Sequence, residues 1–191
     1  MLENVIYEFI NNLKYYEEDI YNEFSLQHEL GIFLREKLEG YKVQFERNIS
    51  FFGGCCKNKK FIRKEIDIVI YKPDFSEKYA IELKYPKNGQ YPETMFSFMK
   101  DIKFMEQVKN KLKFTETYVL TFVTDKNFYE GNLPSRIYEY FRGKTKLPIN
   151  GEVKKPTGRK DESFTIEGTY NINWKKTDTS FVYYLVKVRL E

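Results

Sequence analysis

The stretch that decides the fold is residues 63–85, RKEIDIVIYKPDFSEKYAIELKY. It contains two β-prone runs, 63–72 and 78–85, in which apolar residues alternate with polar ones as they do along a strand. The segment 73–76, Pro-Asp-Phe-Ser, lies between the runs and has the composition of a turn. We therefore expect a β-hairpin.

The register of this hairpin follows if Lys72 pairs with Glu77 around a four-residue turn. Asp67 then lies opposite Glu82, and Lys84 points to the same face as Glu82, because strand side chains alternate with a period of two. Two carboxylates and an amine would thus converge on one patch of the sheet. The buried face would be supplied by Ile66, Ile68, Ile70, Ile81 and Leu83.

Two carboxylates directly across a sheet repel each other, so a positive group is expected between them. Lys84 is one candidate, and a Mg²⁺ ion, which prefers oxygen ligands, is the other. A bound metal would lower the pKa of a water molecule and stabilise charge on a phosphate. Lys84 would then orient or deprotonate that water.

Working outward, hydrophobic periodicity and turn residues predict the remaining elements. Ser25 is the expected N-cap of a helix that stops near Gly40, and the strand after the long helix is expected to be buried and reached by a crossover. The expected elements are helices within 1–40, a strand over 41–52, a helix over 93–113, a buried strand over 117–123, a short helix over 133–141, a loop over 142–163 and a C-terminal β pair at 164–174 and 181–190.

Composition favours one domain over residues 1–191. The chain has 191 residues, of which 41% are hydrophobic, enough for a single core. Residues 1–12 do not resemble a signal peptide and no run is long enough for a membrane span, so we expect a cytoplasmic protein that does not engage membranes. One histidine and two adjacent cysteines argue against a zinc site.

The charge is unevenly spread along the chain. Residues 1–40 hold nine acids and three bases, a net charge of −6; since the whole chain carries +4, the rest carries +10. A basic body is typical of proteins that bind polyanions. The cluster that leads into the Asp67 strand is the expected nucleic-acid contact, and it comprises Lys57, Lys59, Lys60, Arg63 and Lys64.

Glu29 is a further acidic candidate. It falls three residues after Leu26 and four before Phe33, which places a carboxylate near the apolar face of the expected helix. A charge there requires a partner or a metal. The sequence equally allows Glu29 to lie at the edge of that face and contact water.

The order Asp67, then Glu82-Leu83-Lys84 at the end of a hairpin, then a helix and a buried strand resembles the PD-(D/E)XK nuclease superfamily. Ile66 stands where the proline of that motif would be. The resemblance implies an α/β protein with a restriction-endonuclease-like αβββαβ core, in which helices flank a mixed central sheet. The core would span about 22–142, with an N-terminal helix before it and the C-terminal β pair, 164–191, after it.

The resemblance also implies roles for residues. Asp67, Glu82 and the Leu83 carbonyl would bind Mg²⁺, for which Mn²⁺ could substitute; Lys84 would act on the water, and Glu29 would be the first-helix acid. Gln107, which lies on the crossover helix with Asp101 and Glu106, is a weaker candidate, because it falls with Lys100, Lys103 and Lys111 on what the pattern predicts to be a solvated helix face.

The function expected from these features is Mg²⁺-dependent hydrolysis of phosphodiester bonds, in DNA, by a metal-activated water in a bacterial or phage nuclease. A homodimer is compatible with cutting both strands. Two alternatives stay open: a nucleic-acid-binding or interaction module of weak activity on the same fold, and an α/β protein in which the contacts of Asp67 and Lys84 are only structural.

Overall fold

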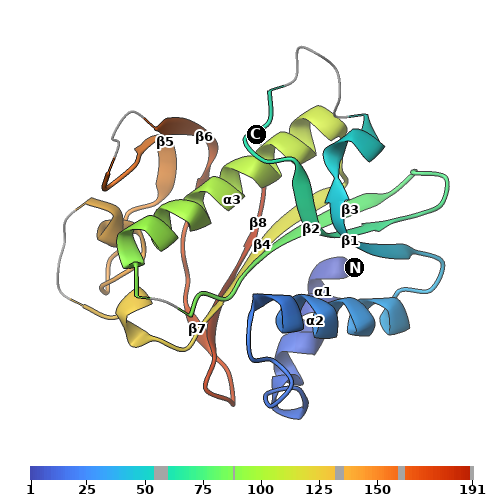
Figure 1. The fold of residues 1–191 in the computed structure, drawn as a ribbon, viewed down its shortest axis with the longest axis horizontal. Coiled ribbons are helices and arrows are strands. Elements are labelled where there is room, and N and C mark those ends of the chain that lie inside the picture. The colour runs from blue at the N-terminus through green and yellow to red at the C-terminus, as the bar shows by residue number, and fades with distance from the viewer. Residues whose placement is uncertain (54–59, 88, 132–135, 159–161, 190–191) are drawn as a thin grey trace.

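The computed structural model describes residues 1–53, 60–87, 89–131, 136–158 and 162–189. It is a mixed α/β structure with a central sheet of six strands flanked by three helices, and a separate sheet of two strands (Figure 1). Four short 3-10 helices, Leu13–Tyr15, Ile49–Phe52, Lys126–Phe128 and Arg136–Tyr140, join the main elements. Those elements are α1 (Leu2–Asn11), α2 (Glu23–Lys37), β1 (Lys42–Asn48), β2 (Glu65–Tyr71), β3 (Lys78–Lys84), α3 (Tyr91–Leu112), β4 (Glu116–Val123), β5 (Ile149–Lys154), β6 (Ser163–Tyr170), β7 (Lys175–Lys176) and β8 (Val182–Lys187).

The central sheet has the strand order β1-β2-β3-β4-β8-β7. Strands β3 and β4 are parallel and connected through α3, while the other neighbours are antiparallel. The β2–β3 register runs from Tyr71 opposite Lys78 to Ile68 opposite Ile81, and the Lys72 N–H donates to the Glu77 carbonyl. The predicted hairpin and its register are confirmed.

Helices cover both faces of the sheet. Side chains from α1 and α2 pack with Ile68, Ile81 and Leu83 on one face, while α3 packs with Val69 and Ala80 on the other. Because both faces are covered, the inner strands β2, β3 and β4 are nearly continuous runs of buried residues. One predicted core residue differs: Ile66 packs in the α3-side cluster and not with the other isoleucines.

Four expectations about the elements differ in the structure. The strand expected over 41–52 ends at Asn48, and residues 49–52 form a 3-10 helix. Asn22, not Ser25, caps α2: its side chain accepts from the Ser25 N–H at 2.8 Å, and Ser25 Oγ accepts from the Asn22 N–H at 3.0 Å. The expected loop over 142–163 contains β5. The expected C-terminal β pair is wrong, because β6 pairs with β5 while β8 pairs with β4. Periodicity predicts a strand but not its partner.

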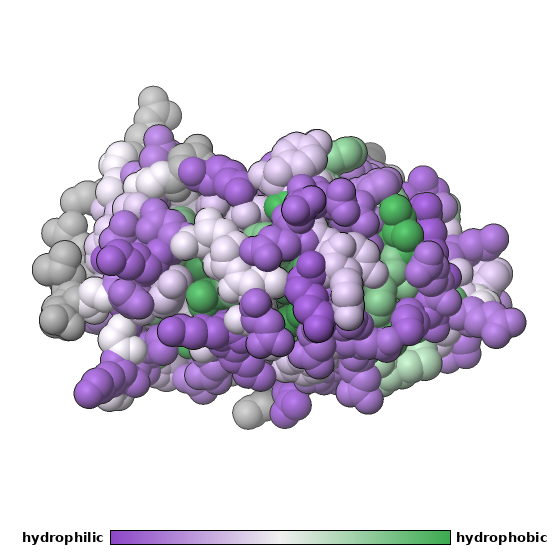
Figure 2. All heavy atoms as spheres, turned by 90° about the horizontal axis from the view of Figure 1, so that it is seen from below, coloured by the Kyte–Doolittle hydropathy of each residue, from purple (hydrophilic) through white to green (hydrophobic). Residues whose placement is uncertain are grey.

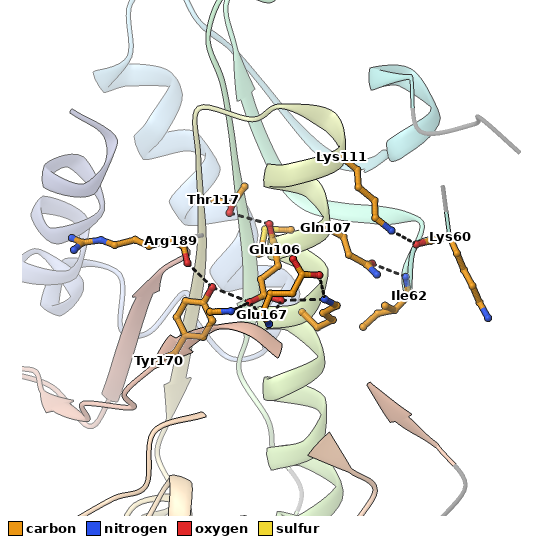
Figure 3. Close-up of polar contacts among 12 residues, drawn as sticks. Lys60, Ile62, Glu106, Gln107, Lys111, Thr117, Glu167, Tyr170 and Arg189 are labelled. Carbon is orange, nitrogen blue, oxygen red and sulfur yellow. Dashed lines mark hydrogen bonds and ion pairs between the residues drawn. The ribbon is translucent and has the colours of Figure 1, made fainter. Parts of the chain in front are cut away.

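The small sheet explains a further correction. The polar face of α3 that carries Gln107 and Lys103 was expected to be solvated, yet both are buried, and Asp101 and Glu106 extend this buried polar row. Glu106 accepts the N–H groups of Glu167 and Gly168, and Gln107 accepts the Ile62 N–H at 2.9 Å (Figure 3). Strand β6 and the segment before β2 therefore dock on this row through specific hydrogen bonds.

The molecular surface carries mostly hydrophilic residues on the face drawn in Figure 2, where hydrophobic residues form small separate areas. Among the residues that the structure describes, no helix combines the length and apolar character needed to cross a bilayer.

Candidate active site

Asp67 and Glu82 meet where the backbone ladder between β2 and β3 ends. Beyond the Ile68–Ile81 pair, the Asp67 carboxylate accepts the Leu83 N–H at 2.7 Å, and the Asp67 N–H donates to Glu82 Oε1 at 3.3 Å. Each carboxylate thus accepts a backbone N–H group that a backbone carbonyl would accept if the β2–β3 ladder continued. The two acidic groups are held side by side, as the hairpin register predicts.

Helix α2 fixes the backbone at this point. The Gln27 amide donates to the Asp67 carbonyl at 2.6 Å and to the Glu46 carboxylate at 2.7 Å. Gln27 is buried. It therefore ties β2 to α2 and to β1, and limits how far Asp67 can move.

Two further residues belong to the site: Asp101 completes the acidic cluster, defined here as Asp67, Glu82 and Asp101, and the Arg63 guanidinium contacts that cluster. Asp101 projects from α3 and is fully buried. Arg63 Nη2 lies 2.5 Å from Asp101 Oδ1, and Arg63 Nη1 lies 3.7 Å from Glu82 Oε2. Ser97 Oγ accepts from the same guanidinium at 3.2 Å. The sequence predicted neither position: Asp101 was given no role in the site, and Arg63 was assigned to the nucleic-acid-binding cluster.

Lys84 extends from β3 toward the start of α2. Its Nζ donates to Glu23 Oε1 at 2.9 Å and to the Leu83 carbonyl at 2.8 Å. The other Glu23 oxygen accepts the Tyr85 N–H at 2.9 Å. The Leu83 carbonyl, expected as a metal ligand, therefore faces the Lys84 amine, and Glu23 holds that amine in place.

Glu23, in the first turn of α2, is the helix acid that contacts this region. Glu29 lies six residues further along α2, about 9 Å along the axis at the helical rise of 1.5 Å per residue. Its carboxylate is 3.3 Å from His28 Nδ1, and its side chain is 21% exposed. The structure thus does not bring Glu29 to the acidic cluster. Glu23 could have been suspected only from its place beside the N-terminus of α2.

Burial dominates the electrostatics of the cluster. Loss of solvation raises the pKa of Asp67 to about 7, although Lys84 and the Leu83 N–H oppose the change. Loss of solvation, opposed by Lys84 and Arg63, raises the pKa of Asp101 to about 6. Burial and the adjacent Asp67 and Asp101 raise the pKa of Glu82 well above its ordinary range. All three carboxyl groups are costly to ionise here.

The charges around the cluster do not balance when every group is ionised. Asp67, Glu82, Asp101 and Glu23 supply four negative charges; Arg63 and Lys84 supply two positive ones. Burial lowers the pKa of Lys84, but Asp101, Glu23 and Asp67 outweigh burial and raise it, so the amine is a cation. With every group ionised, the described residues around the cluster thus fall two positive charges short, which is the charge of one divalent cation.

The donor atoms suit such a cation. Glu82 Oε2 and Asp101 Oδ2 are buried and accept no hydrogen bond from the described residues. Within the same residues, no three His, Cys, Asp or Glu side chains gather as a metal site. Mg²⁺ needs only one or two carboxylates, because it keeps several waters and takes oxygens from a phosphate. Asp67 and Glu82 fit that requirement.

The expected nucleic-acid cluster is only partly described. Lys57 and Lys59 lie outside the described residues. Lys60 and Lys64 are exposed, as phosphate contacts must be, whereas the Arg63 side chain turns inward to the acidic cluster. Three basic residues thus lie in sequence next to the cluster, of which one already contacts it.

The arrangement can hold a hard divalent cation between a fully buried carboxylate, Glu82, and a partly buried one, Asp67, with a lysine cation beside it and exposed lysines close by in the sequence. Such a set suits chemistry on a phosphate ester. Comparison of the chain with protein-family models, with curated proteins and with solved structures finds no match.

Proposed function

We propose that this protein is a Mg²⁺-dependent nuclease that hydrolyses phosphodiester bonds in DNA. The observation that carries the proposal is the pair of carboxylates, a fully buried Glu82 and a partly buried Asp67, beside Lys84, in a site whose described residues supply two positive charges too few when all its carboxyl groups are ionised. Structural ion pairs are normally balanced, since an uncompensated buried carboxylate is destabilising. Such an imbalance is expected where a metal ion completes the site.

The order of elements supports a restriction-endonuclease-like fold. The run α2, β1, β2, β3, α3, β4 has the αβββαβ order, and β4 lies parallel to β3 after a crossover through α3. Asp67 comes from β2, while Glu82 and Lys84 come from β3. This matches the arrangement that the motif Asp67…Glu82-Leu83-Lys84 implies.

Each residue of the site would have its own role in hydrolysis. Asp67 and Glu82 would hold Mg²⁺, which Mn²⁺ could replace. The bound ion would acidify a water molecule and neutralise charge on the phosphate. Lys84, as a cation held by Glu23, would orient that water and stabilise charge at the phosphate. Lys60 and Lys64 would attract the nucleic-acid backbone.

The contacts of Arg63 and Lys84 favour a second candidate function, a binding module without efficient cleavage. Arg63 and Lys84 already contact carboxylates of the site, as permanent counterions would. A nucleic-acid-binding or interaction module of weak activity on the same fold would show such contacts. It would bind DNA in a salt-dependent way without cutting it.

The test is cleavage of circular duplex, linear duplex and single-stranded DNA, with single-stranded RNA alongside, in Mg²⁺ and in EDTA. Lys84→Ala should lower the cleavage rate at least about 100-fold, the size typical of losing a group that assists proton transfer or charge stabilisation. Lys78→Ala is the matched control, because Lys78 lies on the same strand but contacts the Leu112 carbonyl at the other end. Circular dichroism verifies folding.

Three outcomes separate the readings. Cleavage that needs Mg²⁺ and Lys84 supports the nuclease. Salt-dependent DNA binding without cleavage of any substrate supports the binding module. Absence of both Mg²⁺ binding by calorimetry and cleavage by the wild type rejects the proposal.

A further inference from the structure

Arg63 occupies an unusual position for a residue at the edge of a basic surface segment. Its side chain is 28% exposed, yet its guanidinium lies between two side chains that are fully buried, Glu82 and Asp101. Asp101 raises the pKa of Arg63, as do Glu82 and Asp67, and together they outweigh the effect of burial. The guanidinium is therefore one of two cations, with Lys84, that partly neutralise the carboxylates in the absence of metal.

A cavity adjoins the Arg63 side chain. It has a volume of about 340 Å³ and is lined by Ile62, Arg63, Glu93, Phe96, Ser97, Lys100, Lys155 and Glu162. Lys100 and Lys155 both contact Glu162, at 2.5 and 3.3 Å. The cavity thus offers space, two lysines and the Ser97 hydroxyl beside the Arg63 guanidinium, which contacts the acidic cluster.

We propose that Arg63 is a built-in counter-cation that holds the metal position and turns into the adjoining cavity when Mg²⁺ binds, where it contacts a phosphate of the nucleic acid. This inference rests on the proposed nuclease function. It makes Arg63 both a competitor of the metal and a substrate-binding residue. The cavity becomes the binding site for a phosphate next to the one that is cleaved.

Charge repulsion is the reason why Arg63 would leave the metal position when Mg²⁺ binds. Glu82 Oε2, a metal-ligand candidate, lies 3.7 Å from Arg63 Nη1. A divalent ion bound there would be within a few ångströms of the guanidinium, in a region shielded from water, where like charges repel strongly. The guanidinium must move away or weaken metal binding.

The chemistry of the arginine side chain supports the second step, in which Arg63 contacts a phosphate in the cavity. A guanidinium presents several N–H groups in a plane and binds phosphate through two parallel hydrogen bonds. Arg63 already lines the cavity and contacts Ser97, so rotation about its own side-chain bonds brings it there. Binding of the metal would therefore complete the metal site and, at the same time, move the Arg63 guanidinium to a position where it can contact a phosphate.

The experiment uses the full chain and Mg²⁺ alone, with binding measured by isothermal titration calorimetry. Arg63→Gln should bind Mg²⁺ at least about tenfold more tightly than the wild type, because the competing charge is gone. Lys100→Gln is the matched control: it removes a charge from the same cavity, but that charge pairs with Glu162 and acts on Asp101 less strongly than Arg63 does, so it should change the affinity less than about threefold. In EDTA, Arg63→Gln should have a lower Tm than the wild type, and Mg²⁺ should raise that Tm further than it raises the wild type's.

Cleavage provides the second readout. At saturating Mg²⁺, Arg63→Gln should cut DNA more slowly than the wild type although it binds the metal more tightly, since the phosphate contact is lost. If Arg63→Gln does not fold, Arg63→Lys, which keeps a charge but has a shorter reach, should bind Mg²⁺ with intermediate affinity.

The outcomes distinguish this inference from the proposed function. Tighter Mg²⁺ binding with slower cleavage supports the exchange. Equal or weaker Mg²⁺ binding in both Arg63 variants, with a wild type that binds metal and cuts, overturns the exchange and leaves the nuclease standing. Failure of the wild type and the variants alike to bind Mg²⁺ overturns both.

Discussion

Replacing Asp67 by asparagine is expected to stabilise the metal-free protein. The substitution keeps the size of the side chain and an oxygen that can still accept the Leu83 N–H, now 2.7 Å from the carboxylate. What it removes is a negative charge that is buried beside two other carboxylates. In most folded proteins, loss of a native carboxylate is neutral or destabilising, so a gain in stability is a specific signature.

The magnitude follows from the pKa of Asp67, which burial raises from its ordinary value of 3.8 to about 7 in the folded protein. A difference of about 3 pH units, at about 1.4 kcal/mol for each, corresponds to about 4 kcal/mol of unfavourable free energy when the group is ionised. The neutral amide of the Asp67→Asn variant avoids this cost. We expect the free energy of unfolding at pH 8 to rise by about 2–4 kcal/mol, allowing for relaxation of the site.

The sign of the pH dependence provides an independent check. Between about pH 4 and pH 7 the folded protein keeps a proton on Asp67 that the unfolded chain has already released. The native state is therefore favoured at the low end of this window and loses stability as the pH rises through it, and Asp67 itself contributes little further change above pH 7. Urea unfolding in EDTA at a series of pH values measures this slope, which should be shallower in Asp67→Asn.

Asp74→Asn is the matched control. Asp74 is an exposed aspartate in the hairpin turn whose pKa is lowered by hydrogen bonds from Ser76, so its replacement should be slightly destabilising or neutral. The reasoning is refuted if Asp67→Asn is less stable than the wild type at pH 8 in EDTA. That result would mean that the contacts of the charged carboxylate outweigh its desolvation.

Four further predictions test other parts of the molecule. Mg²⁺ should raise the Tm of the wild type by several degrees but that of Asp67→Asn much less, as differential scanning calorimetry would show, since a ligand of the ion is lost. Glu106→Ala should cost about 3 kcal/mol in urea unfolding, because it leaves the Glu167 and Gly168 N–H groups without their acceptor and removes one of the two acceptors near the Tyr170 hydroxyl. Gly31→Ala should cost about 1–3 kcal/mol in the same assay, since its new methyl group would overlap the Phe45 ring. DNA affinity should fall steeply with salt, and the combined Lys60→Gln and Lys64→Gln variant should show a slope smaller by about 2, measured by fluorescence anisotropy.

The elements that could be predicted from the sequence are those whose pattern is local. The hairpin register depends on a four-residue turn and on alternation within two short strands, so the adjacency of Asp67 and Glu82 followed from residues that lie close together along the chain. The crossover helix and the buried β4 followed in the same way, because each carries its own periodicity.

Contacts between distant segments could not be predicted in this way. Glu23 reaches Lys84 across 61 positions, and Arg63 reaches Asp101 from another element, so no local pattern relates them. The polar row on α3 has the composition of a solvated face, and only the docking of β6 and of the segment before β2 buries it. The same limit applied to strand partners: β6 and β8 are both evident as strands, but their pairing depends on which edge is free once the chain is folded.

The sequence by itself thus determined the hairpin, its two facing carboxylates and the lysine beside them, because short-range turn geometry and alternation specify those positions. Tertiary structure alone decided that Asp101, Arg63 and Glu23 surround them and that the cluster is buried. The physical reason is that charge balance and desolvation depend on every element packed around a site, and those elements are brought together only when the sheet and its helices assemble.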